Sequence, residues 1–223
     1  MGGHGDTRGM RAGTGVLVQD RFDGQIVGVG STSGVRAVVG RWPVSPFGPF
    51  ADVMVEDAAG HRVLLAPSAE VAAYVSATYA FDEVVVTPVS VAVGSGDWQV
   101  RAADQLVLHL AVGGPTALGR LLRLVPRRVA TSRQWAGLVD PVARVVLRGV
   151  RTRGAALEGR REWYAATDLR AVTDLSGTWR GRDLGRVAPV DPPCRFGFSS
   201  TPRRPAVTSV VTTVERTAGG SGG

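Results

Sequence analysis

Hydrophobic and polar residues alternate with a period of two along much of this chain, the spacing of β-strands with two different faces. The segment 207–214 alternates most cleanly, with Val210, Thr212 and Val214 on one face. In 106–112, leucines at every second position leave His109 opposite them, and because both faces are largely apolar this strand is predicted to be central. Similar patterns, separated by glycine and proline, predict further strands at 25–29, 35–42, 50–56, 62–66, 83–93, 98–102, 142–148, 161–169, 178–179 and 196–199.

Two segments instead follow the spacing of an α-helix. Ser68 is the predicted N-cap of the first helix, because apolar residues recur at helical spacing over 71–79. The second helix is predicted to begin after a pair of glycines, with Pro115 in its first turn, where a missing N–H costs nothing, and to end before Pro126. A third, shorter helix is expected at 131–139.

Many strands and few helices, without regular β–α–β alternation, predict an α+β, β-rich fold. We expect a mixed or antiparallel sheet that curls into a partly closed barrel with two or three flanking helices. The glycine run 28–34 has the spacing GxGxxxG and lies between two predicted strands, so it favours a hairpin turn over a phosphate-binding loop. The glycine-rich segments 1–15 and 217–223 are predicted to be flexible ends of a single domain, 16–216.

The 223 residues contain no lysine, so all 26 basic side chains are arginines. This composition excludes lysine Schiff-base chemistry, whereas the planar arginine fork suits carboxylates and phosphates. The charge is uneven, with a net −4 over residues 1–119 and a net +11 over residues 120–223. A polyanionic partner and a codon bias that replaces surface lysine by arginine both explain this asymmetry.

The cysteine, the histidines and the apolar segments indicate where the protein is located and whether it binds a cofactor. Cys194 is the single cysteine and cannot form an internal disulfide, which fits a reducing compartment. No segment approaches the ~18 apolar residues of a membrane helix, and the first fifteen residues lack the apolar stretch of a signal peptide, so we expect a cytoplasmic, soluble protein without a membrane partner. His4, His61 and His109 are too scattered for a metal-ligand motif, and neither a metal nor a cofactor is expected. The oligomeric state stays open.

The segment 120–161 holds eleven arginines and only two acidic residues, Asp140 and Glu158. Such a field would suit phosphate contacts with nucleic acid. The arginines are nevertheless interleaved with apolar residues at strand and helix spacing, and no aromatic platform of an RNA-binding module accompanies them. Binding of nucleic acid or another polyanion is therefore the alternative function, after a small-molecule site.

Two places carry side chains suited to such a site. Residues Arg161, Glu162, Trp163 and Tyr164 form the densest polar and aromatic cluster, in which Glu162 and Tyr164 share one strand face. Facing a cavity, they would form a polar pair for a small ligand; facing outward, they would be ordinary strand residues. His109 is either a hydrogen-bonded interior residue or, inside a barrel, an acid or base.

As a whole the chain resembles an uncharacterised protein family of high-GC bacteria. The shared features are Gly-Val-Arg at 34–36, the block Ser-Pro-Phe-Gly-Pro-Phe-Ala-Asp at 45–52, the cluster 161–164, and 196–202. Because that family has no assigned activity, this resemblance implies nothing about function.

A second resemblance covers only residues 35–56. There a strand, a turn over 45–50 and an acid two residues after an aromatic are similar to acetoacetate decarboxylase-like proteins. This resemblance implies a curled barrel around a small-molecule cavity, with Asp52 in the place of the active-site glutamate. Those decarboxylases need a buried lysine, which this chain lacks, so a shared fold would not bring the shared reaction.

We therefore expect a protein that binds or transforms a small acidic or carbonyl compound in a barrel cavity, without Schiff-base chemistry. It is either a binding protein or an enzyme of lyase or isomerase type, and the fold alone does not choose between them. A protein–protein partner without a pocket is a third possibility. The candidate residues are Asp52, Glu162 and His109 as catalytic groups and Arg36, Arg161 and Tyr164 as ligand-binding groups.

Overall fold

The computed structural model describes residues 17–126, 129, 153–155, 161–197 and 201–217, with backbone only for 17, 153–155, 161–164 and 216–217. Its helices are α1 (Ala69–Ser76) and α2 (Ala117–Leu124). Its strands are β1 (Leu17–Ser31), β2 (Arg36–Val44), β3 (Phe50–Glu56), β4 (Arg62–Ala66), β5 (Glu83–Val86), β6 (Val89–Val93), β7 (Asp97–Ala102), β8 (Leu106–Pro115), β9 (Arg153–Ala155), β10 (Arg161–Trp179), β11 (Arg182–Asp183), β12 (Val187–Ala188) and β13 (Ala206–Thr217).

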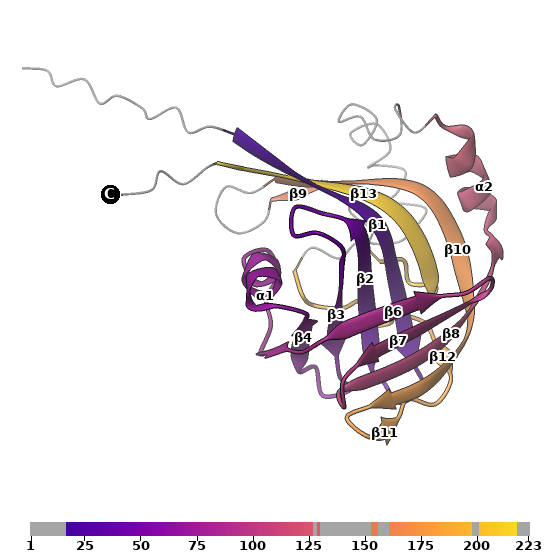
Figure 1. The fold of residues 1–223 in the computed structure, drawn as a ribbon. Helices are drawn as coiled ribbons and strands as arrows, with labels where there is room; N and C mark the ends of the chain where they lie inside the picture. Colours follow the sequence, from indigo (N-terminus) through magenta and orange to yellow (C-terminus); the bar gives the residue numbers. More distant parts are fainter. Residues whose placement is uncertain (1–16, 127–128, 130–152, 156–160, 198–200, 218–223) are drawn as a thin grey trace, which may run out of the picture.

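The strands form one sheet, with the order β5-β4-β3-β2-β1-β13-β10-β8-β7-β6 and three short strands paired at its sides. Within the described residues every strand pair is antiparallel except β4 with β5, which α1 connects as a crossover. The sheet is strongly curled, and Figure 1 shows β6, β7 and β8 turned around to face β1 and β2. This open half-barrel, flanked by two described helices, confirms the predicted β-rich α+β fold.

The main core fills the concave face of the half-barrel. It joins side chains from strands that lie far apart in the sheet order, such as Val53 and Val55 of β3 with Trp98 of β7 and Leu108 of β8. These side chains are at most 3% exposed. Because apolar side chains occupy this face, the interior that the sequence suggested as a ligand cavity is a packed core.

The opposite face of β1 to β4, which we call the outer face, carries the alternate residues of the same strands. Ile26, Val38 and Val210 pack there against Val190 and Phe196 of the segment after β12. The side chains of α1 cover Leu64 and Ala66 of β4 on the same side of the sheet. A polar residue on this face is therefore buried under the helix and the 190–196 segment, which is what positions the site described below.

Both described helices begin with a hydroxyl N-cap, of which only that of α1 was predicted. Ser68 Oγ accepts the N–H of Val71 at 3.2 Å and opens α1. In α2 the N-cap is Thr116, whose Oγ1 accepts the N–H of Gly119 at 3.0 Å. Pro115, predicted in the first turn, is instead the last residue of β8, because Arg170 of β10 pairs with it.

Most predicted strands are present, with three differences. The segment 83–93 forms two strands, since β5 ends before the Thr87-Pro88 pair and a proline cannot donate to the ladder. The segments 161–169 and 178–179 are parts of the single long strand β10. Residues 196 and 197 are not in a strand, and 198–200 lie outside the described residues.

The glycine run 28–34 ends in the predicted hairpin turn, since 28–31 complete β1 and the chain turns over 32–35 into β2. The helix expected at 131–139, the strand expected at 142–148 and the segments 1–15 and 218–223 lie outside the described residues. No described helix combines the length and the apolar character that crossing a bilayer requires.

Candidate functional site

A pocket of about 70 Å³ lies on the outer face, between the sheet and α1. β1, β2, β3 and β13 supply its floor, and α1 with the two residues 78 and 79 after it supplies its cover. None of its lining residues is basic, and Asp52 carries the one carboxyl group among them. The lining residues are Phe22, Ile26, Val38, Gly40, Trp42, Phe50, Asp52, Met54, Tyr74, Val75, Thr78, Tyr79, Thr212 and Val214.

Aromatic rings form one wall of this pocket. The ring of Phe22 packs edge-on against Trp42, with centroids 5.7 Å apart, and against Phe50 at 6.4 Å. Tyr74 of α1 contacts the same Phe22 ring at 5.5 Å, so the helix and the sheet are joined through this cluster. Such contacts hold the wall in one arrangement and leave an apolar surface for a ligand.

Asp52 places a carboxyl group in this apolar setting. Strand alternation separates it from Val53, which enters the main core, and turns it to the outer face. Its residue is 4% exposed, and its Oδ1 accepts a hydrogen bond from Trp42 Nε1 at 3.0 Å. Desolvation by burial raises the pKa of Asp52 from 3.8 to about 7, and the Trp42 hydrogen bond opposes that rise only in part.

Gly40 leaves the room that the Asp52 carboxyl occupies. The two residues are opposite each other in the β2–β3 ladder. A Cβ at position 40 would overlap Asp52 Oδ1 and Trp42 Nε1. A glycine is therefore required here by the close approach of the acid and its donor.

Thr212 of β13 is the second polar group of interest on the pocket wall. It is 3% exposed, and its Oγ1 has no hydrogen-bond partner among the described residues. A buried hydroxyl without a partner is uncommon in folded proteins and needs a physical explanation.

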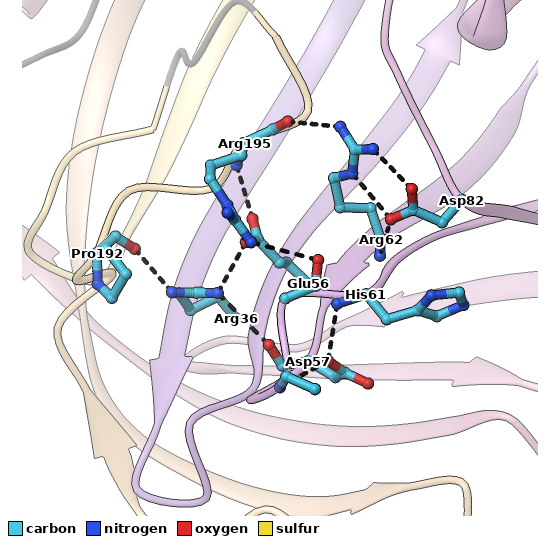
Figure 2. Close-up of polar contacts among 10 residues, drawn as sticks. Arg36, Glu56, Asp57, His61, Arg62, Asp82, Pro192 and Arg195 are labelled. Carbon is cyan, nitrogen blue, oxygen red and sulfur yellow. Dashed lines mark hydrogen bonds and ion pairs between the residues drawn. The ribbon is translucent and has the colours of Figure 1, made fainter.

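Arg36 lies on the same strand face as Gly40 but outside the pocket, in an ion-pair network (Figure 2). Its Nη2 contacts Glu56 Oε1 at 3.0 Å, and its Nη1 donates to the carbonyl of Pro192 at 3.2 Å. Glu56, which is fully buried, also accepts from the Nε of Arg195 at 2.8 Å and from its backbone N–H at 2.6 Å. The guanidinium expected to bind an oxyanion ligand thus binds an internal carboxylate and ties β2 and β3 to the 192–195 segment.

This network extends to the surface through a second pair. Arg62 binds Asp82 through two nitrogens, at 2.7 and 3.0 Å, and donates to the carbonyl of Arg195 at 3.2 Å (Figure 2). The guanidinium of Arg62 holds the pKa of Asp82 well below its usual range. The whole cluster joins β2, β3 and β4 to the segment before β13, which is a structural role.

His109 lies away from both features. Its strand places Leu108 and Leu110 in the main core and His109 on the other face, half-buried, in register with Gln99 and Ser176. It does not line the pocket of Asp52.

Arg161, Glu162 and Tyr164 are at the start of β10, where only the backbone is described. The β10–β13 register pairs Glu162 with Val214 and Tyr164 with Thr212. Both partners line the pocket, so the backbone brings these two positions next to its β13 wall.

Most of the arginine-rich segment 120–161 falls outside the described residues, so polyanion binding stays a prediction. Six arginines of the described part form ion pairs with acids of this chain. The pairs are Arg36 and Arg195 with Glu56, Arg62 with Asp82, Arg123 with Asp168, Arg180 with Glu83 and Arg203 with Asp191.

Within the described residues no group of three or more His, Cys, Asp or Glu side chains could hold a metal ion. Cys194 is buried in the outer-face cluster, and desolvation raises the pKa of its thiol to about 12. The thiol is therefore neutral at physiological pH and packs as a small apolar group.

Trp42, Gly40 and Thr212 were not singled out from the sequence, although they shape the surroundings of Asp52. One signal was present, because Gly40 and Trp42 share a face of the predicted strand 35–42. Thr212 offered no such signal, since a threonine in an alternating strand is common on any sheet.

No protein-family model matches this chain, and no curated protein matches it either. Among solved structures, the chain is similar to the acetoacetate decarboxylase of Legionella pneumophila subsp. pneumophila str. Philadelphia 1, with 9% sequence identity and a TM-score of 0.41. The match covers 96% of this chain and 92% of that chain. A function is therefore inferred below from the chain's own residues.

Proposed function

We propose that the outer-face pocket binds a small neutral carbonyl compound and that Asp52 forms a hydrogen bond with its carbonyl oxygen. The observation that carries this proposal is a buried carboxyl with a pKa of about 7 that faces an apolar, aromatic-walled pocket. A protonated carboxyl donates a hydrogen bond, which a carbonyl oxygen accepts.

The lining favours a neutral ligand over an anionic one. No basic side chain lines the pocket, and Arg36 is bound to Glu56. A carboxylate ligand would be buried without a cation and would be repelled by Asp52 whenever that group is ionised. Of the two ligand classes expected from the sequence, acidic and carbonyl, the pocket thus supports the carbonyl class.

Asp52 is also suited to proton transfer. A group with a pKa near 7 exists in both forms at neutral pH, which favours general acid–base catalysis. The ionised form removes a proton from the carbon next to the carbonyl, and the C–H electron pair moves toward the carbonyl oxygen. The protonated Asp52 then returns the proton to the enolate, at the same carbon in hydrogen exchange or at the oxygen in keto–enol isomerisation. This is an isomerase type of reaction and needs no lysine. Glu162 and Tyr164 remain candidate ligand contacts on the strength of their register beside β13.

Binding is tested with a series of ketones, from 2-butanone to 2-octanone, against the matching carboxylates, measured by thermal shift and ligand-observed NMR. Ketones that bind the native state raise its melting temperature. We expect ketones to stabilise the protein more at pH 6 than at pH 8, because Asp52 loses its proton between these values. Asp52→Asn should bind with no pH dependence over this range, since its amide donates at every pH.

Gly40→Ala tests whether ketones bind in the outer-face pocket. The added methyl group overlaps Asp52 and Trp42 atoms, and ketone binding should be lost. Gly114→Ala is the matched control, because nothing lies within 4 Å of its Cβ position. If no ketone stabilises the protein at pH 6, or if Gly40→Ala binds ketones as well as the parent chain does, the proposed function is wrong.

Proton transfer is measured separately, as exchange of the α-hydrogens of a bound ketone for deuterium in D₂O. The protein should accelerate this exchange, and Asp52→Asn should abolish the acceleration. Binding without faster exchange would assign a binding protein rather than an enzyme.

A further inference from the structure

Trp42 holds one oxygen of the Asp52 carboxyl. From the neighbouring strand β2, its Nε1 donates to Oδ1 at 3.0 Å. Among the described residues, this is the one side-chain hydrogen bond that the carboxyl accepts. Burial raises the pKa of Asp52, and the indole hydrogen bond opposes that rise. The reason is that an N–H donor stabilises the ionised carboxylate more than the neutral acid.

The residues around the indole hold it in one orientation. Gly24 of β1 and Gly40 of β2 lie against the ring, since a Cβ at either position would overlap its atoms, Cε3 for Gly24 and Nε1 for Gly40. Phe22 packs edge-on against the same ring, with centroids 5.7 Å apart. Packing therefore fixes the direction of the Nε1–H bond, and with it the oxygen of Asp52 that receives this bond.

The second oxygen of Asp52, Oδ2, remains accessible. In the described part, fully buried polar side-chain atoms without a hydrogen-bond partner belong to Arg36, Ser76, Thr201 and Thr212. Asp52 is not among them, although no described side chain donates to its Oδ2. Because Asp52 lines the pocket, the accessible surface of Oδ2 faces the pocket interior.

We infer that Trp42 is a positioning residue, which binds Oδ1 so that Oδ2 alone meets the ligand. This inference rests on the proposed function, in which Asp52 contacts a carbonyl compound. In the protonated acid, Oδ2 carries the proton and donates a hydrogen bond to the carbonyl oxygen, because Oδ1 already accepts from the indole. In the ionised form, the same Oδ2 takes the proton from the carbon next to the carbonyl.

The loss of the indole N–H should change the pH range of ketone binding. Trp42→Phe keeps an aromatic ring beside Phe22 and removes the donor to Asp52. Without that donor the carboxylate is less stable, and Asp52 keeps its proton to higher pH. The midpoint of the fall in ketone binding with pH should therefore move upward by about one to two pH units. Ligand-observed NMR from pH 5 to pH 10, with the ketone that most stabilises the parent chain, measures it.

Trp98→Phe is the matched control. It makes the same change in the main core, and Trp98 does not line the pocket. We expect it to lower stability and to leave the midpoint unchanged. If Trp42 only filled space, Trp42→Phe would weaken ketone binding by the same factor at every pH and would not move the midpoint.

Other titratable groups near the pocket are separated by a second control. Among the described residues, Tyr74 and Tyr79 line the pocket from its cover, and the Tyr74 hydroxyl donates to Asp20 of β1 at 3.0 Å. The ion-pair network of Arg36 lies outside the lining. Asp52→Asn should remove the midpoint altogether, which assigns it to Asp52 and not to any of these groups.

The parent chain provides a readout that needs neither a variant at Trp42 nor a ligand. The Nε1–H resonance of Trp42 is assigned through its contacts with the Phe22 ring. It should move downfield as Asp52 ionises, because a charged acceptor strengthens the hydrogen bond. Its midpoint should equal that of ketone binding, and Asp52→Asn should abolish the movement.

The outcomes separate this inference from the proposed function. If ketones bind the parent chain but Trp42→Phe leaves the midpoint in place, the positioning inference is overturned and the proposed function stands. The inference is also overturned if the Trp42 resonance does not titrate with Asp52, which decides the matter even where Trp42→Phe fails to fold. If no ketone binds, the proposed function is wrong, and the indole titration still decides whether Trp42 holds the Asp52 carboxyl.

Discussion

The buried carboxyl of Asp52 makes the stability of this protein depend on pH. The pKa of Asp52 is about 7 in the folded chain and 3.8 in its ordinary state. The folded state therefore holds this proton more tightly than the unfolded state does. The stability that the protonated group contributes is complete below pH 3.8 and is lost as the pH rises through 7.

We predict that the free energy of unfolding falls, relative to that of Asp52→Asn, as the pH rises from 4 to 8. A shift of this size corresponds to a change on the order of 4 kcal/mol. Urea unfolding of both proteins across this range measures it, and subtracting the curve of the variant removes the other titrating groups. Parallel stability curves would show that Asp52 ionises as in water.

Glu56 is a buried acid with a different environment, because it contacts two arginines, Arg36 and Arg195. Glu56→Gln leaves the buried Arg36 guanidinium without its counter-charge and should destabilise the fold by about 3–5 kcal/mol. Asp82→Asn, which removes the exposed partner of Arg62, should have little effect. Urea midpoints compare the two, and equal losses would contradict the buried-pair explanation.

At the scale of elements, α1 matters because it covers the pocket, whereas α2 does not. Each begins with a hydroxyl cap, Ser68 for α1 and Thr116 for α2. Ser68→Ala and Thr116→Ala should each lower the free energy of unfolding by about 1 kcal/mol. Only Ser68→Ala should also weaken ketone binding, because it loosens the helix that supplies Tyr74 and Val75 to the wall.

Thermal shift of both variants, with and without the ketone that most stabilises the parent chain, makes this comparison. Equal loss of ligand binding in Ser68→Ala and Thr116→Ala would mean that the ligand does not lie beneath α1.

At the scale of the whole molecule, the two faces of the sheet have different roles. The concave face holds the core, to which Leu108 contributes with 1% exposure, and the outer face holds the pocket. Leu108→Ala should therefore destabilise the protein by about 2–5 kcal/mol. The folded fraction should still bind ketones with the affinity of the parent chain, which NMR titration below the melting temperature measures. A weaker affinity would show that the core face and the pocket are coupled.

The sequence alone determined the local structure. Strand boundaries at 50–56 and 62–66, the Ser68 cap and the 28–34 hairpin depend on residue type and on a period of two or 3.6, which neighbours in the chain already express. The resemblance over 35–56 also singled out Asp52 before any contact was known. These features are short-range, and short-range physics is visible in the order of residues.

Only the tertiary structure decided which face of the sheet is filled and which carries a pocket. Alternation separates Asp52 from Val53 but does not say which of the two meets Trp98 and Leu108 from the far end of the sheet. In the same way, the sequence does not show that Arg36 pairs with Glu56, which is opposite it in the β2–β3 ladder. Nor does it show that the Thr212 hydroxyl is buried without a hydrogen-bond partner among the described residues. Burial and pairing depend on strands that are tens of residues apart in the chain, so the tertiary arrangement of the sheet, and not the local pattern, set the chemistry of each group.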